Sequence, residues 1–329
     1  MLISKCIAFT IKVSAILIYY TTDVHGSTVC FKKFLKAGAF YQADAVILGG
    51  DITGKLIVPI LEQPNGSYSC KHQGTTYDLK SQEELDQLRK RIEDQGYYSY
   101  VADEKQIEEF RVNKSKVDEL FTELMRKRVE DWIQLAEERL KDQEFDCYIQ
   151  PGNDDRYLID PLFEKSKRII NPDGKVLQLD KNHEMISTGH ANITPWDCPR
   201  DEPEEKLGEI IENLVARVKN MNDCIFNFHC PPYDTNLDIA PKLDETLKPT
   251  TSASGVKTAH VGSVAVREAI DSHQPLLGLH GHIHESKASQ SLGRTLVLNP
   301  GSEYGEGVLH GVLVELNENG IKNHMFVQG

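Results

Sequence analysis

Short apolar runs that end in polar residues recur along the chain and predict the strands of a sheet. Residues 15–20 form one such run, and residues 45–48 form a second that ends in a Gly-Gly-Asp sequence. Between them, residues 27–37 have the pattern of a helix. This strand–helix–strand order predicts an α/β fold in which neighbouring strands run parallel.

Further along the chain, the same patterns predict more strands and two long helices. Strands are expected at residues 145–149, 176–179, 184–188 and 224–228, and several short strands with glycine turns follow residue 276. A helix is expected over residues 204–218. Another begins at Ser115 with Asp118 and carries apolar residues at helical spacing: Val117, Leu120, Phe121, Leu124, Trp132, Leu135 and Ala136.

The segment 56–112 differs from its surroundings and is interpreted as an insertion within one domain that spans residues 12–329. Asn65-Gly66 is a hairpin-turn signal between segments of mixed polarity. Ser81 with Glu84 has the spacing of a capping box for a charged helix that ends before Gly96. We therefore expect a small α+β cap that sits on the main sheet.

The composition is that of an ordinary globular protein, with 40% hydrophobic and 26% charged residues. Lys and Arg number 37 against 50 Asp and Glu, which gives a formal charge of -13. Nucleic-acid binding normally relies on clustered Lys and Arg, so the acidic balance disfavours DNA or RNA as a partner.

The seven cysteines are scattered and include no C-x-x-C pair, which argues against a disulfide framework or a zinc cluster and favours the cytoplasm. The apolar run at residues 6–20 resembles a secretory signal, but Lys12 interrupts it, and its removal would delete the strand before Asp23. We interpret it as part of the domain. No other stretch is long enough to span a membrane.

Five clusters of polar residues follow predicted strands directly. They are Asp23 and His25, Asp51, Asn153 and Asp154, His229, and His282 and His284. Taken alone, each is more often a turn, a surface pair or a core histidine. The carboxyl ends of parallel strands meet at one edge of a sheet, so together they predict one site. Asp, Asn and His donors suit Mn²⁺, Fe²⁺ or Zn²⁺.

This order of clusters resembles the five-block signature of the calcineurin-like metallophosphoesterase superfamily, and in particular its phosphodiesterase-like members. The resemblance implies a four-layer α/β/β/α sandwich and two divalent metal ions, foremost Mn²⁺, with Fe²⁺, Zn²⁺, Ni²⁺ or Co²⁺ as alternatives. It also implies the ligands: Asp23, His25 and His284 for one metal, Asn153, His229 and His282 for the other, and Asp51 as the bridge.

The implied reaction is hydrolysis of a phosphate ester by metal-bound hydroxide, with Asp51, Asn153 and Asp154 as catalytic residues. Two cations about 3.5 to 4 Å apart lower the pKa of a shared water and stabilise an in-line displacement. Many members of the superfamily have His where this chain has Asp154. An aspartate donates a proton only if its pKa is raised, and nearby cations lower it. We therefore interpret Asp154 as an orienting group, which favours a phosphodiesterase over a protein phosphatase.

Three residues are candidates for substrate contacts. Arg156 follows the Asn153 cluster and is either a phosphate clamp or a surface salt bridge. His260 precedes a predicted helix start at Gly262-Ser263, whose N–H groups suit an anion. Asn299 begins an Asn-Pro-Gly-Ser segment that resembles one near the site of the smaller phosphodiesterase-like members, with a plain turn as the alternative. His190 and His280 are interpreted as structural.

The leading hypothesis is a phosphohydrolase that acts on a small phosphorylated molecule. One alternative is a non-catalytic scaffold, because a retromer subunit resembles these enzymes in fold, although every ligand position is filled here. Another is a nuclease of the same superfamily, which would need a basic groove.

Replacing residues 56–112 by a short linker is expected to change which esters are cleaved while leaving bound metal in place, because every predicted ligand lies outside this segment. Metal content and the relative turnover of several esters, measured on both proteins, test this division of roles. Loss of metal from the shortened protein would contradict it.

Overall fold

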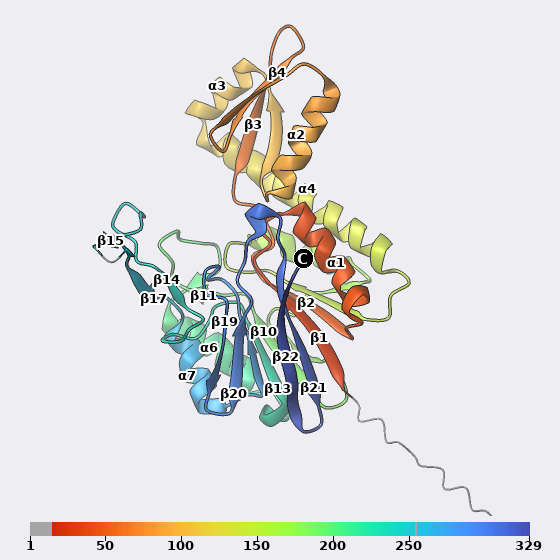
Figure 1. Cartoon of the computed structure of the whole chain (residues 1–329), viewed down its shortest axis with the longest axis vertical. Helices are drawn as coiled ribbons and strands as arrows, with labels where there is room; N and C mark the ends of the chain where they lie inside the picture. Colours follow the sequence, from red (N-terminus) through yellow and green to blue (C-terminus); the bar gives the residue numbers. More distant parts are fainter. Residues whose placement is uncertain (1–14, 254) are drawn as a thin grey trace, which may run out of the picture.

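The computed structural model describes residues 15–253 and 255–329. The body of the protein contains two six-stranded sheets, and a smaller subdomain projects from one end (Figure 1). The predicted start of the domain at residue 12 and most of the apolar run that includes Lys12 lie outside the described residues.

The first sheet contains the strands predicted near the N-terminus. Its order is β22 (Gly320–Gln328), β21 (His310–Asn317), β1 (Ile16–Thr21), β2 (Ala45–Gly49), β7 (Asp146–Gln150) and β8 (Ile169–Ile170). Strands β1, β2, β7 and β8 run parallel, which confirms the predicted strand–helix–strand arrangement. Strand β21 is antiparallel to both of its neighbours, β1 and β22.

The second sheet consists of strands from the C-terminal half of the chain. Its order is β19 (Ala288–Leu292), β20 (Thr295–Asn299), β18 (Leu277–Leu279), β13 (Cys224–Phe228), β10 (Glu184–Thr188) and β9 (Val176–Gln178). The four central strands are parallel, and the strand at each edge is antiparallel. Both sheets therefore have a defined edge at which the carboxyl ends of their central strands lie.

Helices cover the outer face of each sheet and complete four layers. The first sheet packs against α1 (Thr28–Tyr41), α4 (Lys114–Leu140) and α5 (Asp160–Phe163), and the second against α6 (Glu204–Val215) and α7 (Val264–His273). Alternation along β1 shows the layering, because Ile18 and Tyr20 join the core between the sheets whereas Tyr19 packs with the helices. The predicted α/β/β/α sandwich is confirmed.

Residues within the segment 56–112 form a separate four-stranded sheet with two helices. The sheet order is β5 (Thr75–Leu79), β4 (Tyr68–His72), β3 (Ile57–Glu62) and β6 (Tyr98–Ala102), accompanied by α2 (Gln82–Asp94) and α3 (Glu104–Val112). It has its own apolar cluster, which includes Ile60, Leu88 and Ile92. We call this subdomain the cap.

The two helix starts predicted in and near the cap, at Ser81 and Ser115, are confirmed only in part. Ser81 accepts a hydrogen bond from the Glu84 amide, as an N-cap should, but the Glu84 carboxylate accepts from the Lys80 amide rather than from Ser81. The N-cap of α4 is Asn113, not Ser115, because the Asn113 side chain accepts from the Lys116 amide.

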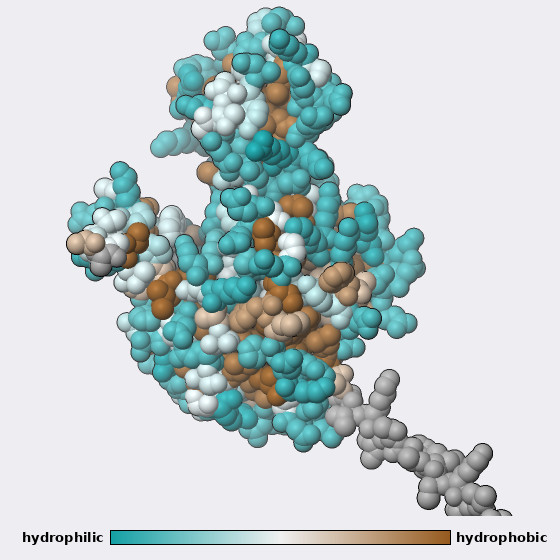
Figure 2. Space-filling model, in the orientation of Figure 1, coloured by the Kyte–Doolittle hydropathy of each residue, from teal (hydrophilic) through white to brown (hydrophobic). Residues whose placement is uncertain are grey.

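Smaller elements decorate the body. They are β11 (Ala191–Asn192), β12 (Asp201–Glu202), an arm made of β14 (Ile239–Pro241), β15 (Thr251–Ser252), β16 (Gly255–Val256) and β17 (Thr258–His260), and the 3₁₀ turns η1 (Tyr157–Ile159), η2 (Met221–Asp223) and η3 (Tyr304–Glu306). The visible surface of the cap is mostly hydrophilic, whereas apolar residues gather over the lower body (Figure 2). Within the described chain, no helix has the length and apolar character needed to cross a bilayer.

The two tryptophans provide a matched test of the packing. Trp132 of α4 is buried and stacks on Phe31 of α1 with ring centroids 4.0 Å apart, whereas Trp196 is 61% exposed. Trp132→Ala is expected to lower the free energy of unfolding by roughly 3–5 kcal/mol, and Trp196→Ala by no more than about 0.5 kcal/mol. Chemical denaturation measures both. Equal losses would contradict the position of α4 in the core.

Candidate metal centre

The five predicted polar clusters follow five strands of the two sheets. Asp23 and Asp51 follow β1 and β2, Asn153 follows β7, His229 follows β13, and His282 follows β18. These strands are central and parallel within their sheets, so both sheets present the clusters at their carboxyl ends. The sandwich therefore brings residues from both halves of the chain to one place.

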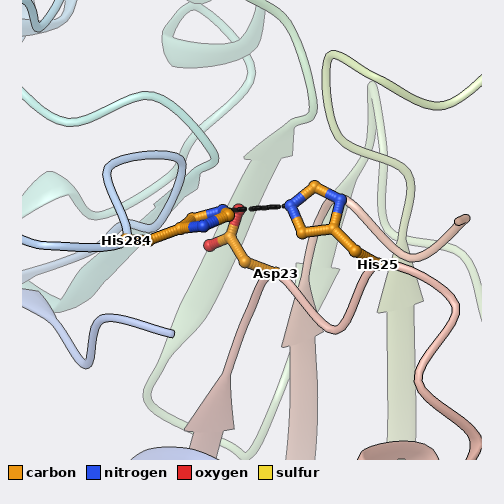
Figure 3. A group of neighbouring side chains, drawn as sticks. All are labelled: Asp23, His25 and His284. Atoms are coloured by element: carbon orange, nitrogen blue, oxygen red, sulfur yellow. Dashed lines mark hydrogen bonds and ion pairs between the residues drawn. The ribbon is translucent and has the colours of Figure 1, made fainter. Parts of the chain in front are cut away.

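Asp23, His25 and His284 (Figure 3) form the first of three groups of potential ligands in the described chain, the third of which is His25, Asp51 and Asp154. The Nε2 atoms of His25 and His284 lie 3.0 Å apart, and Asp23 Oδ1 lies 3.4 Å from His284 Nε2 and 3.8 Å from His25 Nε2. Asp23 and His25 are fully buried, and the His284 side chain is 26% exposed. One cation placed among these three atoms would contact all of them.

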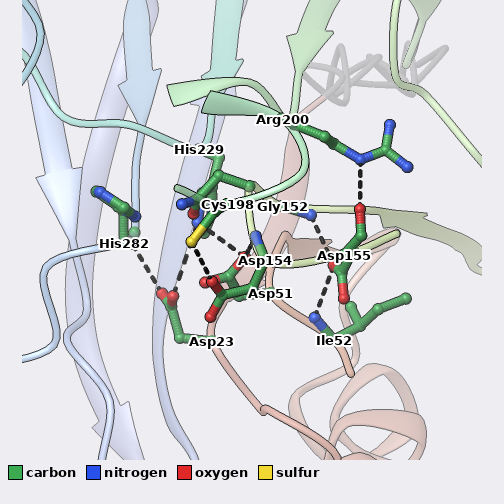
Figure 4. Close-up of polar contacts among 12 residues, drawn as sticks. Asp23, Asp51, Ile52, Gly152, Asp154, Asp155, Cys198, Arg200, His229 and His282 are labelled. Atoms are coloured by element: carbon green, nitrogen blue, oxygen red, sulfur yellow. Dashed lines mark hydrogen bonds and ion pairs between the residues drawn. The ribbon is translucent and has the colours of Figure 1, made fainter. Parts of the chain in front are cut away.

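Asp51, His229 and His282 form the second group (Figure 4). Asp51 Oδ1 lies 3.4 Å from His229 Nε2, while its other oxygen, Oδ2, lies 3.6 Å from His25 Nε2 of the first group. The two oxygens of one carboxylate thus face different groups. This is the arrangement expected of a carboxylate that bridges two cations.

A hydrogen bond from its side-chain nitrogen orients Asn153. Its Nδ2 donates to Asp201 Oδ1 at 2.9 Å, while its Oδ1 is buried and has no hydrogen-bond partner among the described residues. Its neighbours Gly152 and Asp154 both adjoin Asp51. The amide oxygen is therefore left free as a ligand beside the second group.

Several buried polar atoms at this site have no hydrogen-bond partner within the described chain. They include Asp23 Oδ1, His25 Nδ1, Asn153 Oδ1 and His229 Nε2. A buried polar atom that lacks a hydrogen bond costs about 1–3 kcal/mol, so each needs an explanation. Cations would satisfy Asp23, Asn153 and His229 at once. The donor set therefore fits two divalent metals.

The pKa values of the buried groups also indicate that the site needs positive charge. Although burial opposes a charged imidazole, Asp51 and Asp23 raise the pKa of His229 to about 10. Burial likewise opposes the charge on Asp51, yet His229 lowers the pKa of Asp51. Without a cation, the two carboxylates thus retain a proton on His229, and metal binding would displace it.

The backbone is strained at four of the predicted ligands. Asp23, His25, Asp51 and His282 have φ of 54°, 38°, 51° and 67°, the left-handed region that L-residues seldom adopt. Such strain persists only where the surroundings impose it and is concentrated at functional sites. Gly152 allows the loop after β7 to approach Asp51 closely, because a Cβ at this position would lie 2.2 Å from Asp51 Oδ1.

Hydrogen bonds to backbone groups fix the orientation of the ligand side chains. His229 Nδ1 lies 2.9 Å from the Gly49 carbonyl, which leaves Nε2 pointing to the cluster. The His282 amide donates to Asp23 Oδ2 at 2.9 Å, and the Asp154 amide donates to Asp51 Oδ1 at 3.0 Å. The carboxylates are therefore held by backbone groups as well as by the histidines.

Asp155 supports the site, a role that the sequence pattern did not reveal. Its buried carboxylate accepts from the amides of Ile52, Thr53 and Gly152 at 2.7–3.0 Å and from the Thr53 hydroxyl at 2.6 Å. Burial and the charge of Asp51 raise its pKa to about 6. Asp155 thus ties the loop after β2 to the loop after β7. Its only signal was its place beside Asp154.

Asp154 lies at the edge of the cluster with two partners that were also missed. Its Oδ2 is 2.6 Å from Lys55 Nζ and 3.8 Å from His25 Nδ1, and its Oδ1 accepts from the Cys198 thiol at 2.8 Å. Both oxygens thus accept hydrogen bonds, as expected of a carboxylate that orients its neighbours rather than donating a proton.

Arg156 does not point to the cluster. Its guanidinium donates to Asp118 Oδ1 at 2.6 Å and to the Thr122 hydroxyl at 2.7 Å, and lies over the Phe121 ring. All three partners belong to α4. The geometry is that of the salt bridge, so the prediction of a phosphate clamp is corrected.

His260 and the helix start that follows it are also already engaged. His260 Nδ1 lies 2.7 Å from Asp238 Oδ1. The amides of Val264 and Ala265, at the start of α7, donate to the carboxylate of Glu204 at 3.0 and 2.9 Å. An acidic side chain of the protein itself therefore occupies the position predicted for an anion, and that prediction is corrected.

Asn299 is a structural residue next to the site. It is fully buried, its Nδ2 donates to the carbonyls of Gly281 and Ile283, and its Oδ1 accepts from the Gly301 amide. It therefore shapes the loop that carries His282 and His284 instead of facing a substrate.

The two histidines interpreted as structural make contacts that suit that role. His280 Nδ1 lies 2.9 Å from the Phe228 carbonyl, and burial lowers its pKa to about 4. His190 Nδ1 lies 3.1 Å from the Thr188 hydroxyl.

Comparisons with known proteins show the fold but not the activity. No family model matches the chain. The uncharacterized protein MJ1162 of Methanocaldococcus jannaschii is 34% identical over 153 residues, which are 46% of this chain and 61% of that protein. The similarity thus spans less than two thirds of that relative.

Two solved structures are similar over nearly the whole chain. One crystal structure gives a TM-score of 0.55 at 16% identity, and TT1561 of Thermus thermophilus gives 0.52 at 14%; each covers 96% of this chain and 99% of the other. YfcE, a phosphoesterase from E. coli, covers 94% and 98% at 12% identity, but its TM-score of 0.33 is too low to equate the folds. Fold and site together define an α/β/β/α sandwich with a buried Asp–Asn–His cluster.

Asp51→Asn tests the central carboxylate, because it keeps the size of the side chain and removes its charge. Mn²⁺ at a hundredfold its Kd is expected to stabilise the wild-type protein by about 2.7 kcal/mol, and the variant by far less. Thermal unfolding with and without Mn²⁺ measures this. Asp131→Asn, on the exposed face of α4, is the control. An equal gain in the Asp51 variant would contradict the assignment.

Proposed function

We propose that the chain is a metal-dependent phosphoesterase that acts on a small phosphorylated molecule, and a phosphodiesterase more than a protein phosphatase. The observation that supports this most is the position of Asp51, whose two oxygens face His229 and His25. Asp23, His25 and His284 would hold one cation, and Asn153, His229 and His282 the other. Mn²⁺ is the metal that we propose, since the donors are nitrogen and oxygen without thiolate.

Bound divalent cations would lower the pKa of a coordinated water and neutralise charge on the phosphoryl oxygens. The protein's own groups would fix the geometry. The loops after β1 and β2 are joined by backbone hydrogen bonds from Asp23 to Gly50 and from His25 to Asp51, at 3.0 and 2.9 Å. Asp155 holds the loop after β7 to the same place. Little rearrangement would then be needed when substrate binds.

Asp154 supports the preference for a diester. Its carboxylate lies 3.8 Å from His25, and both of its oxygens are engaged by Lys55 and Cys198, so neither is placed to donate to a leaving group. A phosphate monoester carries a second negative charge that a diester lacks, and the Asp154 carboxylate would repel it. Proton supply to the leaving group would come from water.

The cap would select the substrate. It is anchored beside both ligand loops, because the Ser27 hydroxyl donates to the Asp94 carbonyl at 2.6 Å and the Gly54 amide donates to Tyr98 Oη at 2.9 Å. Ser27 follows His25 by two residues, and Gly54 follows Asp51 by three. The cap is thus joined to both ligand loops without supplying a ligand.

Two other functions fit the site less well. A non-catalytic scaffold would have no use for a strained backbone together with unpartnered buried polar atoms at Asp23 and His25. A nuclease would need a basic surface, and the chain carries a net charge of -13.

Asp154→His tests both the activity and the diester preference. The wild-type protein with Mn²⁺ is expected to cleave bis-p-nitrophenyl phosphate in preference to p-nitrophenyl phosphate. The variant is expected to shift the ratio of kcat/KM about tenfold toward the monoester, since removing one nearby charge alters the energy by ~1.4 kcal/mol or more. Asp244→Asn, in the distant arm, is the control. Hydrolysis that persists after complete metal removal would contradict the proposal.

A further inference from the structure

Lys55 is a cation beside the candidate metal centre to which no role has been assigned. It lies in the connection between β2 and β3, four residues after Asp51, and its Nζ is 2.6 Å from Asp154 Oδ2. Its side chain is 44% exposed, so the ammonium group is in contact with both the site and solvent. This ion pair adjoins the cluster, because Asp154 Oδ2 also lies 3.8 Å from His25 Nδ1.

The backbone on each side of Lys55 is held by a single residue of the cap. The Gly54 amide donates to Tyr98 Oη, and the Tyr98 amide donates to the Leu56 carbonyl, each at 2.9 Å. Tyr98 is 2% exposed and packs in the core of the body. Lys55 therefore extends from a fixed point at the junction of cap and body.

The charges around Lys55 define what it can bind. Burial lowers the pKa of Lys55, but Asp154 and Asp51 outweigh that effect and raise it above the ordinary value, so the group is an ammonium ion. An ammonium has three N–H donors, and Asp154 takes one. Two N–H donors are thus left for an anion.

We propose that Lys55 binds a non-bridging oxygen of the substrate's phosphate group, held in position by Asp154 and Tyr98. This inference rests on the proposed function and adds a substrate-binding residue to it. Asp154 alone would repel a phosphate from this side of the site. Lys55 supplies the positive charge there, at the point where the cap meets the metal cluster.

The test compares Lys55→Met, Lys55→Arg and the double variant Lys55→Met/Asp154→Asn with Mn²⁺ and bis-p-nitrophenyl phosphate. Loss of one charge-assisted hydrogen bond is expected to raise KM, and the Ki of inorganic phosphate, roughly 10- to 100-fold in Lys55→Met, with a smaller change in kcat. Lys55→Arg is expected to recover part of the affinity. Metal content should be unchanged in all variants.

The double variant separates substrate binding from simple neutralisation of Asp154. If Lys55 binds phosphate, the double variant regains only the affinity that repulsion by Asp154 had cost, and its KM and Ki stay above the wild-type values. Recovery of both constants to wild-type values in the double variant would overturn the proposal, as would wild-type constants in Lys55→Met. The matched control is Lys116→Met, because Lys116 is 45% exposed and paired with Glu109 away from the site.

Phosphate binding to the Mn²⁺-loaded protein, measured by calorimetry, distinguishes this inference from the proposed function. Wild-type protein that binds Mn²⁺ and phosphate without hydrolysing either ester would refute the proposed function alone. In that case a loss of phosphate affinity in Lys55→Met would still support the role of Lys55, and an unchanged affinity would refute it.

Discussion

The buried carboxylate of Asp51 imposes the constraint on which the rest of the site depends. It lies in a fully enclosed position with a second carboxylate, Asp23, close enough for both to contact His229 within 4 Å. Two like charges so close together, and out of water, need positive charge beside them. Protonation of His229 supplies some of it, and a pair of divalent cations would supply more. The histidines, the free Asn153 oxygen and the strained loops are all arranged around that requirement.

The fold meets this requirement by using the ends of two sheets. Strands β1, β2 and β7 deliver the aspartates, His25 and Asn153, while β13 and β18 of the facing sheet deliver the other three histidines. The core between the sheets therefore sets the distance from the carboxylates to His229 and His282. Asp155 and Asn299 then fix the loops on either side through hydrogen bonds to backbone groups. Stability and function are linked, because the loops keep positive φ only while these contacts persist.

Local patterns allowed the parallel strands and the convergence of the polar clusters to be predicted, whereas the four-layer sandwich and the ligand set were implied by the resemblance to a known family. Apolar runs mark buried strands, and the polar residue after each run marks its end, so Asp51 and His229 could be placed at one edge without coordinates. Lys55, Cys198 and Asp155 have no such local signal. Their roles come from contacts between loops that are far apart in the chain, such as Asp155 with Thr53 across 102 residues. Arg156 and the helix start after His260 illustrate the converse, since each suggested an anion site but is engaged by an acidic side chain of the protein, Asp118 or Glu204.

The central claim is that the buried cluster holds two cations, one on each side of Asp51. The most direct test is a crystal of the protein soaked in Mn²⁺, with anomalous diffraction used to locate the metal. The account predicts two anomalous peaks about 3.5 to 4 Å apart, with a carboxylate oxygen of Asp51 next to each. A map with no peak within coordination distance of Asp51, His229 and His284 would contradict it.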